Sequence, residues 1–337
     1  MNDLTGLAVD FAAVEAAARR IRTHAIRTPL LHFPDLDQRL GIRLLVKAET
    51  LQRTGSFKFR GACNKLTVLR EAQPGAKSVV AFSSGNHAQG VACAAAILGF
   101  KATIVMPSDA PAIKIANTKS FGASVVFYDR QTESREAMAA DIAQREGAAI
   151  VPPYDDPSVI AGQGTVGLEI GQDCSDIGVK PDIVLAPCSG GGLIGGVAIA
   201  IKHRFPAASV YAAEPEGFDD LARSLKAGER LSNPPGPSSI CDSLMAQRPG
   251  ELTFPINRLL LAGSLMVGDQ VVLSAMRFAF ERLKLVIEPG GAAALAVALA
   301  QRNVWRGKTV IVVASGGNVD PAMMKRAIDA EDPMFEE

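Results

Sequence analysis

The residues with the clearest chemical capability form a glycine-rich segment, Pro187-Cys188-Ser189-Gly190-Gly191-Gly192-Leu193-Ile194-Gly195-Gly196. The segment follows an apolar run that predicts a buried strand, and it opens a stretch that predicts a helix. Glycines let the backbone approach an anion closely, and the first turn of a helix directs several N–H donors toward that anion. The pattern therefore predicts a phosphate-binding turn, and a tight turn without any ligand is the alternative.

The same segment also fits the dinucleotide-binding pattern G-x-G-x-x-G, through Gly190, Gly192 and Gly195. Glu214 follows about 20 residues later, at the end of the next predicted strand, where such sites place an acidic residue. Taken alone, the segment therefore leaves a nicotinamide-dependent oxidoreductase as a competing interpretation.

A second segment could supply a catalytic amine. It reads Thr54-Gly55-Ser56-Phe57-Lys58-Phe59-Arg60-Gly61 and places Lys58 between two aromatic residues near a predicted helix start. Partial desolvation and the positive end of a helix both lower the pKa of an ammonium group, which suits a lysine that forms a Schiff base. An ordinary solvated surface lysine is the alternative.

Two further turns carry polar groups at the ends of predicted strands. The first, Phe82-Ser83-Ser84-Gly85-Asn86-His87, leads into an alanine-rich helix. Its hydroxyl and N–H groups can receive a carboxylate, and Asn86 can donate to a ring oxygen; helix capping by Ser84 or Asn86 is the alternative. The second, Ser315-Gly316-Gly317-Asn318, follows the last predicted strand.

The elements that position these turns alternate along the chain. Apolar runs predict strands at 78–83, 102–106, 124–128, 148–151, 182–187, 209–213 and 309–314. Helices are predicted at 87–98, 112–120, 134–146, 159–171, 193–202, 269–284 and 291–301. This alternation predicts an α/β fold with mostly parallel sheets, and the continuous apolar runs are typical of strands buried on both faces. Because loops after parallel strands share one edge of a sheet, the four segments could meet in one cleft.

Two blocks of this alternation run from about residue 82 to 153 and from about residue 182 to 315. The pieces before the first block, Thr28-Pro29 and residues 44–47, are expected to be irregular or antiparallel. Residues 331–337 form an acidic stretch that we expect to be solvated and frayed.

Composition excludes several classes of function. The 337 residues include 35 Lys+Arg and 35 Asp+Glu, so the net charge is zero and favours neither a nucleic-acid nor a membrane partner. No apolar run reaches the ~18 residues of a membrane-spanning helix, and no secretory signal is visible. The five cysteines and four histidines show no zinc or disulfide spacing. We therefore expect a cytoplasmic protein.

Together these motifs resemble those of the serine/threonine dehydratase and serine racemase family, pyridoxal-phosphate enzymes of fold type II that include 3-hydroxyaspartate dehydratases. The resemblance extends from Ile26-Arg27-Thr28-Pro29-Leu30 to Ser315-Gly316-Gly317-Asn318. It implies two open twisted sheets with flanking helices and an active site in the cleft between two domains. Residues 1–55 with 154–330 would form the large cofactor-binding domain and residues 56–153 the small domain. It also implies a homodimer.

The resemblance assigns roles to individual residues. Lys58 would form the Schiff base with the cofactor and move the Cα proton, and Phe57 would also bind the cofactor. Asn86 would bond the ring hydroxyl of the cofactor and Ser315 its pyridine nitrogen, and a neutral Ser there favours expulsion of a β-leaving group. The phosphate would be held by Ser189, Gly190, Gly191, Gly192 and Leu193. The substrate carboxylate would lie against Ser83, Ser84 and His87, and in racemases of the family the serine matching Ser84 is the second acid/base.

The resemblance also implies a cation site and a substrate preference. Glu214, Asp220 and the carbonyl of Phe218 would bind Mg²⁺, or Ca²⁺ or Mn²⁺, as oxygen ligands; two solvated carboxylates are the alternative. Family members with an arginine at the position of Arg135 can direct it toward a second carboxylate, as in 3-hydroxyaspartate. A solvated arginine in the first turn of a helix is the alternative.

We therefore expect a pyridoxal-phosphate-dependent ammonia-lyase. It would eliminate water from 3-hydroxyaspartate, serine or threonine and give a 2-oxo acid and ammonia. Alternatives are a serine or aspartate-type racemase on the same scaffold, the nicotinamide-dependent oxidoreductase, and a non-catalytic amino-acid-binding protein. The oxidoreductase interpretation leaves Lys58 and the two polar turns unexplained.

Overall fold

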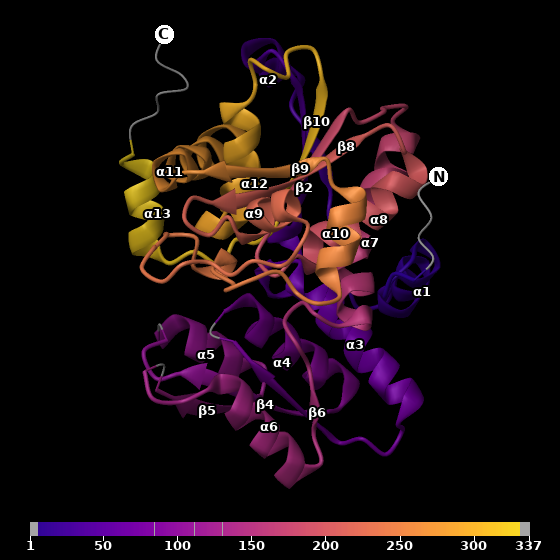
Figure 1. Cartoon of the computed structure of the whole chain (residues 1–337), viewed down its shortest axis with the longest axis vertical. Helices are drawn as coiled ribbons and strands as arrows, with labels where there is room; N and C mark the ends of the chain where they lie inside the picture. The colour runs from indigo at the N-terminus through magenta and orange to yellow at the C-terminus, as the bar shows by residue number, and fades with distance from the viewer. Residues whose placement is uncertain (1–5, 84, 111, 130, 331–337) are drawn as a thin grey trace.

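The computed structural model describes residues 6–83, 85–110, 112–129 and 131–330. Two separate sheets organise these residues, and in Figure 1 the smaller sheet lies below the larger one. The expectation of an α/β fold with two mostly parallel sheets is confirmed.

The larger sheet has six strands. In spatial order they are β1 (Leu30–His32), β2 (Arg43–Ala48), β10 (Thr309–Ala314), β7 (Ile183–Pro187), β8 (Ser209–Pro215) and β9 (Gly263–Val267). Of these six, only β1 runs antiparallel to its neighbour; β2 and β10 pair in parallel from Arg43 opposite Thr309 to Ala48 opposite Ala314. The expectation that residues 44–47 are irregular or antiparallel is therefore corrected, because β2 is a regular strand that is antiparallel to β1 and parallel to β10.

The smaller sheet has four strands, all parallel. In spatial order they are β5 (Ser124–Tyr128), β4 (Lys101–Pro107), β3 (Ser78–Phe82) and β6 (Ala149–Ile150). The expectation that β5 is buried on both faces is wrong, because β5 is an edge strand. Val126 and Phe127 on it are 37% and 45% exposed.

Helices cover both faces of each sheet (Figure 1). Alternate residues of a strand point to opposite faces. Val310 and Val312 therefore pack toward α11 (Asp269–Phe278) and α12 (Pro289–Ala300), whereas Ile311 and Val313 pack toward α7 (Pro157–Asp176) and α8 (Gly192–Arg204). In the smaller sheet, α3 (Lys58–Ala72) and α4 (Asn86–Leu98) cover one face and α6 (Arg135–Glu146) the other.

The remaining elements complete these layers. The other helices of the described residues are α1 (Phe11–Ile21), α2 (Pro34–Leu40), α5 (Ala112–Ser120), α9 (Asp220–Ala227), α10 (Thr253–Leu260) and α13 (Pro321–Ile328). Short 3₁₀ turns span Glu49–Leu51, Arg53–Gly55 and Asp242–Leu244. A π-helical turn at Ala279–Leu283 continues α11, so the single helix predicted at 269–284 is interrupted near its end.

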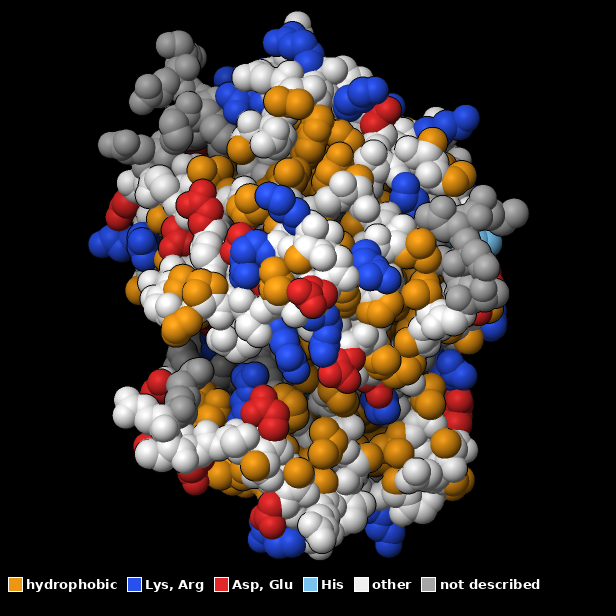
Figure 2. All heavy atoms as spheres, in the orientation of Figure 1, with side chains coloured by type: hydrophobic (Ala, Val, Ile, Leu, Met, Phe, Trp, Pro, Cys, Tyr) orange, Lys and Arg blue, Asp and Glu red, His pale blue; other side chains and the backbone are white. Residues whose placement is uncertain are grey.

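Further observations concern the cysteines, the membrane-spanning helices, the surface charge and the division into domains. All five cysteines are free and buried. No helix in the described part of the chain is long and apolar enough to cross a membrane. The face in Figure 2 carries Lys and Arg side chains intermingled with Asp and Glu. The division into domains at residues 55/56 and 153/154 stays a prediction.

Candidate active site

Lys58 begins α3, and its side chain is half-buried. Nζ donates a hydrogen bond to the carbonyl of Pro153 at 2.8 Å and lies 5.2 Å from the centroid of the Phe57 ring. Burial lowers the pKa of Lys58 to about 8, although the nearby Glu288 carboxylate opposes part of this effect. A larger share of the amine is therefore neutral at physiological pH than for a solvated lysine, as a nucleophilic or proton-accepting amine requires.

The start of α3 is fixed by a buried ionic cluster two residues beyond Lys58. Arg60 is fully buried, and its guanidinium donates to Glu49 at 2.8 Å and to Glu169 at 2.7 Å. Removing one partner of such a cluster would leave an uncompensated buried charge, so the cluster holds this helix end in place. The Phe57 N–H also donates to the carbonyl of Ser315 at 3.0 Å, which brings the lysine segment to the end of β10.

The glycine-rich turn connects β7 to α8. Gly191 is the N-cap of α8 with φ of 92°, a left-handed conformation that favours glycine. A Cβ on Gly190 would lie 2.2 Å from the ring of Tyr154, and one on Gly191 would lie 2.4 Å from Nδ2 of Asn257. The close packing of these side chains explains why the turn consists of glycines.

The turn offers free donors. Within the described part of the chain, no acceptor is found for the N–H groups of Gly190, Gly192 and Leu193. Ser189 Oγ accepts a hydrogen bond from the Ala246 N–H at 3.2 Å and keeps its own proton available for donation. Unpaired N–H groups at a helix start suit a phosphate group, so this turn fits the anionic end of pyridoxal phosphate.

Ser315 and His87 carry polar atoms without partners. Ser315 is 5% exposed and follows β10, and its hydroxyl makes no hydrogen bond to any residue that the structure describes. His87 Nε2 lies 2.9 Å from the carbonyl of Val151, and its Nδ1 is buried without a partner among the described residues. Burial lowers the pKa of His87 to about 3, with the Lys58 charge acting in the same direction, so the imidazole is neutral. These atoms fit an additional bound group.

Asn86 is held by two side chains from distant parts of the chain. Its Nδ2 donates to Glu288 at 2.5 Å, and its Oδ1 accepts from Asn318 at 2.7 Å. Sequence reasoning missed Glu288, which lies immediately before α12 and is 4% exposed. An acidic residue between an apolar stretch and a proline-initiated helix was the available signal, but its burial was not visible in the sequence.

Two of the expected substrate residues, Ser83 and Arg135, lie next to Phe82 at the end of β3. Ser83 Oγ accepts from the Gly85 N–H at 3.2 Å, whereas Ser84 lies outside the described residues. Arg135 begins α6; its guanidinium lies 5.4 Å from the centroid of the Phe82 ring, and its Nε donates to Glu136 at 2.8 Å. Its side chain is 47% exposed, so the guanidinium retains donors that can reach a ligand.

The two carboxylates expected to bind a cation are buried; Glu214 lies near the end of β8 and Asp220 begins α9. Both Glu214 oxygens accept hydrogen bonds, from the N–H groups of Leu221 and Ala222 at 2.9 Å. Asp220 accepts from Asn233 with one oxygen, while its Oδ2 is buried without a partner among the described residues. Burial raises the pKa of Glu214 to about 7 and that of Asp220 to about 6. The described residues contain no cluster of three or more His, Cys, Asp and Glu side chains suited to a metal.

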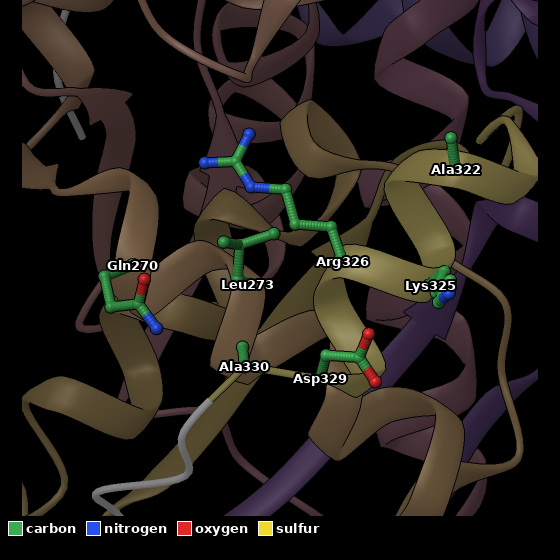
Figure 3. A pocket seen from close by; sticks show the side chains of 7 residues that line it. All are labelled: Gln270, Leu273, Ala322, Lys325, Arg326, Asp329 and Ala330. Carbon is green, nitrogen blue, oxygen red and sulfur yellow. The ribbon is translucent and has the colours of Figure 1, made fainter.

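A hollow of about 680 Å³ lies elsewhere, between α11 and α13 (Figure 3). It is lined by Gln270, Leu273, Ala322, Lys325, Arg326, Asp329 and Ala330. None of these is a predicted site residue, so this hollow is separate from the candidate active site.

The site thus contains a lysine with a lowered pKa, together with backbone N–H groups and a serine hydroxyl that have no partner among the described residues. A model of the family described as "Pyridoxal-phosphate dependent enzyme" matches residues 21–316. The chain belongs to this family. The match spans the glycine-rich turn as well as Lys58, so the nicotinamide interpretation of that turn loses its support.

Within this family, the chain is similar to ammonia-lyases and serine racemases. It is 43% identical over 90% of its length to an L-threo-3-hydroxyaspartate ammonia-lyase from Pseudomonas sp, covering 93% of that protein. It is 40% identical over 91% of its length to a serine racemase from Schizosaccharomyces pombe, again covering 93%. The crystal structure of a threonine deaminase from T.th. superposes with a TM-score of 0.86 at 45% identity, over 92% of this chain and 99% of that one. The predicted membership and the predicted class, a pyridoxal-phosphate-dependent lyase, are confirmed.

Proposed function

We propose that this enzyme eliminates water from a β-hydroxy amino acid, with 3-hydroxyaspartate preferred over serine and threonine. The proposed preference for 3-hydroxyaspartate rests on the position of Arg135. Its guanidinium lies over the ring of Phe82, which directly precedes the turn that contains Ser83 and His87. A planar guanidinium can bind a carboxylate through two parallel hydrogen bonds. Serine and threonine lack the second carboxylate that 3-hydroxyaspartate would offer. The name of the Pseudomonas sp relative agrees with this choice.

Pyridoxal phosphate, when bound, withdraws electrons from Cα of the amino acid and so acidifies the Cα–H bond. Lys58 would hold the cofactor and accept the Cα proton at Nζ, which its lowered pKa allows. The N–H groups of the turn from Ser189 to Leu193 would bind the phosphate. Ser315 would bond the ring nitrogen, and Asn86 would donate to the ring oxygen.

Other residues would orient the substrate. Ser83 and His87 would contact the α-carboxylate, and Arg135 the distal carboxylate. Lys58 would take the Cα proton, and the β-hydroxide would leave with one proton as water, which leaves an enamine. Release of the proton from Lys58 returns the residue to its starting state, so the loss of one water is balanced. The enamine then hydrolyses to a 2-oxo acid and ammonia, so all atoms of the substrate and of the water consumed are accounted for.

Racemisation is the second candidate, since serine racemases are among the relatives. It requires an acid/base on the face opposite Lys58, and Ser84 would be that group. A hydroxyl acts in this way only when its pKa is lowered.

The experiment that tests the proposed function follows the purified enzyme with L-threo-3-hydroxyaspartate, L-serine and L-threonine in separate reactions. We expect release of 2-oxo acid and ammonia in equal amounts, fastest from hydroxyaspartate. Chiral analysis of the remaining amino acid measures racemisation in the same samples. Inversion of serine that outpaces release of 2-oxo acid from all three substrates would contradict the proposal and favour the racemase.

We also propose that Glu214, Asp220 and the carbonyl of Phe218 bind Mg²⁺, or Ca²⁺ or Mn²⁺. The buried, unpartnered Oδ2 of Asp220 supports this, as does the carbonyl of Phe218, which accepts no hydrogen bond from any described residue. Oxygen atoms completed by water suit these hard cations. The cation would also relieve the repulsion between two buried carboxylates.

Adding Mg²⁺ is expected to stabilise the protein against thermal unfolding. A ligand that binds only the folded state at about 100 times its Kd adds about 2.7 kcal/mol to the free energy of unfolding. Differential scanning fluorimetry with Mg²⁺ and with a chelator measures this. Asp220→Asn should abolish the response, whereas the neighbouring control Asp219→Asn should keep it; equal responses in both variants would refute the site.

Three further features complete the proposal: the oligomeric state, the location in the cell and the division into domains. The enzyme would be a homodimer, supported by exposed apolar side chains of Leu51, Phe280 and Val286, each at least 44% exposed. It would be cytoplasmic, supported by five buried free thiols. Residues 1–55 with 154–330 would form the cofactor-binding domain, and residues 56–153 the small domain.

A further inference from the structure

Glu288 is a buried carboxyl group that the steps above do not use. It precedes α12 and is 4% exposed, and its N–H donates to the carbonyl of Gly316 at 3.0 Å. Its Oε1 accepts a hydrogen bond from Asn86 Nδ2 at 2.5 Å. A Cβ on Gly316 would lie 2.1 Å from this oxygen, so glycine at that position leaves room for the carboxyl group.

The hydrogen bonds around Asn86 define which way its carboxamide faces. Asn318 Nδ2 donates to the carbonyl of Thr54 at 2.7 Å and to Asn86 Oδ1 at 2.7 Å. The Thr54 carbonyl can only accept, so Asn318 must present its amide nitrogen. Asn86 therefore presents oxygen to Asn318 and nitrogen to Glu288.

With this orientation, Asn86 can donate two hydrogen bonds, because an amide nitrogen carries two N–H bonds. One N–H of Asn86 is given to Glu288, and no other acceptor for Nδ2 is found in the described part of the chain. The second N–H therefore remains available. A reversed carboxamide would offer only an oxygen, which cannot donate to the ring oxygen of the cofactor.

We propose that Glu288 is a positioning residue that fixes the Asn86 carboxamide and, through it, the ring of the bound cofactor. The inference rests on the proposed contact between Asn86 and pyridoxal phosphate, not on the identity of the substrate. Glu288 immediately precedes α12, which packs on the larger sheet, while Asn86 starts α4, which packs on the smaller one. The pair therefore also joins the two sheets of the fold at the cofactor.

The charge state of Glu288 is sensitive to its surroundings. Burial raises the pKa of Glu288 to about 7; the hydrogen bond from Asn86 lowers it, Asp242 raises it, and Lys114 and Lys58 lower it. Lys114 and Asp242 pair with each other at 2.5 Å, so their opposite effects partly cancel. Glu288 is thus mostly protonated below about pH 7 and ionised above it. Ionisation strengthens the hydrogen bond from Asn86, because charge-assisted bonds are the stronger ones.

The test compares Glu288→Ala and Glu288→Gln with Glu281→Gln, a control in the preceding π-helical turn whose carboxylate pairs with Arg277 near the protein surface. Each apo-protein is titrated with pyridoxal phosphate, and the visible spectrum of each holoenzyme is recorded from about pH 6 to about pH 8.5, a range that spans the expected charge change of a group with a pKa near 7. Circular dichroism establishes that each variant is folded.

We expect Glu288→Ala to weaken cofactor binding by about tenfold or more, as for loss of a charge-assisted hydrogen bond. Glu288→Gln, whose side-chain oxygen can still accept from Asn86, should bind the cofactor within about threefold of the unmodified protein. It should nevertheless lose a spectral change centred near pH 7 that the unmodified protein and Glu281→Gln both show.

The proposal is overturned if Glu288→Ala matches Glu281→Gln in cofactor affinity. It is equally overturned if Glu288→Gln keeps the full spectral change, and this second criterion decides alone should the alanine variant not fold. Normal cofactor binding without any elimination would instead contradict the proposed function, so the two failures are distinguishable.

Discussion

Replacing Lys58 by alanine is expected to abolish both turnover and covalent attachment of the cofactor. The Lys58 amine is held at the site by Pro153 and partly desolvated, and burial lowers its pKa to about 8. Loss of a nucleophile that is also the proton acceptor should reduce kcat by at least about 10⁴-fold. The measurement is 2-oxo acid release, together with borohydride reduction followed by peptide mass analysis.

The control is Lys65→Ala, on the same helix but paired with Asp156 at 2.6 Å. Lys65→Ala should retain most of its activity, and borohydride should label Lys58 in it. Label on a different lysine, or elimination by Lys58→Ala at an undiminished rate, would refute the assignment.

The lowered pKa of Lys58 has a consequence for reconstitution. Only the neutral amine attacks an aldehyde, and a group with a pKa near 8 is half neutral at that pH and almost fully neutral about one unit above it. The rate at which apo-protein takes up pyridoxal phosphate should therefore rise from about pH 6, reach half of its maximum near pH 8 and level off above about pH 9. For an ordinary lysine the rate would still be rising at about pH 10.

Replacing Arg135 by alanine is expected to change substrate preference. The guanidinium lies over the Phe82 ring next to Ser83, and its ionic partner among the described residues is the adjacent, exposed Glu136. Losing a bidentate contact to a carboxylate should lower kcat/KM for 3-hydroxyaspartate by about tenfold to a hundredfold. The kcat/KM for serine, which has no second carboxylate, should change by less than about threefold. Steady-state kinetics on both substrates measure the ratio.

Two further variants make this result specific. Arg135→Lys keeps the charge but not the planar pair of donors, so we expect an intermediate loss. Arg145→Ala removes an exposed arginine from the same helix, where it pairs with Asp141, and should alter the kinetics of neither substrate. Equal losses on hydroxyaspartate and serine in Arg135→Ala would show that the residue supports the fold and does not select the substrate.

Periodicity predicted most elements closely because the central strands are buried on both faces. The limits of the inner strand β10 agree with the predicted range, and those of the inner strands β3 and β7 differ by one residue; the limits of the edge strand β5 also agree, although it is partly exposed. Two strands that were not predicted, β1 and β9, lie at the two edges of the larger sheet, where exposure permits polar residues and weakens the apolar signal. The longer of the two is β9. Its first residue is Gly263 with φ of 157°, which further obscures the pattern.

Some residues of the candidate site could be identified from the sequence, whereas others are recognised only from contacts in the folded chain. Lys58, Asn86 and the glycines from Gly190 to Gly192 lie in local motifs whose residue types already limit the chemistry, so the sequence alone was sufficient to single them out. Tyr154 packs on Gly190, and neither residue indicates this contact in isolation.

The sequence by itself determined the α/β class, the order of the elements, the turn suited to phosphate and the lysine suited to a Schiff base, because each depends on neighbouring residues. Only the tertiary structure decided which groups are desolvated and which distant side chains meet. The contact between Glu288 and Asn86 joins residues 202 positions apart, and the raised pKa of Glu288 comes first from burial. Burial and long-range contacts arise when separate elements pack together, so no local pattern of residues encodes them.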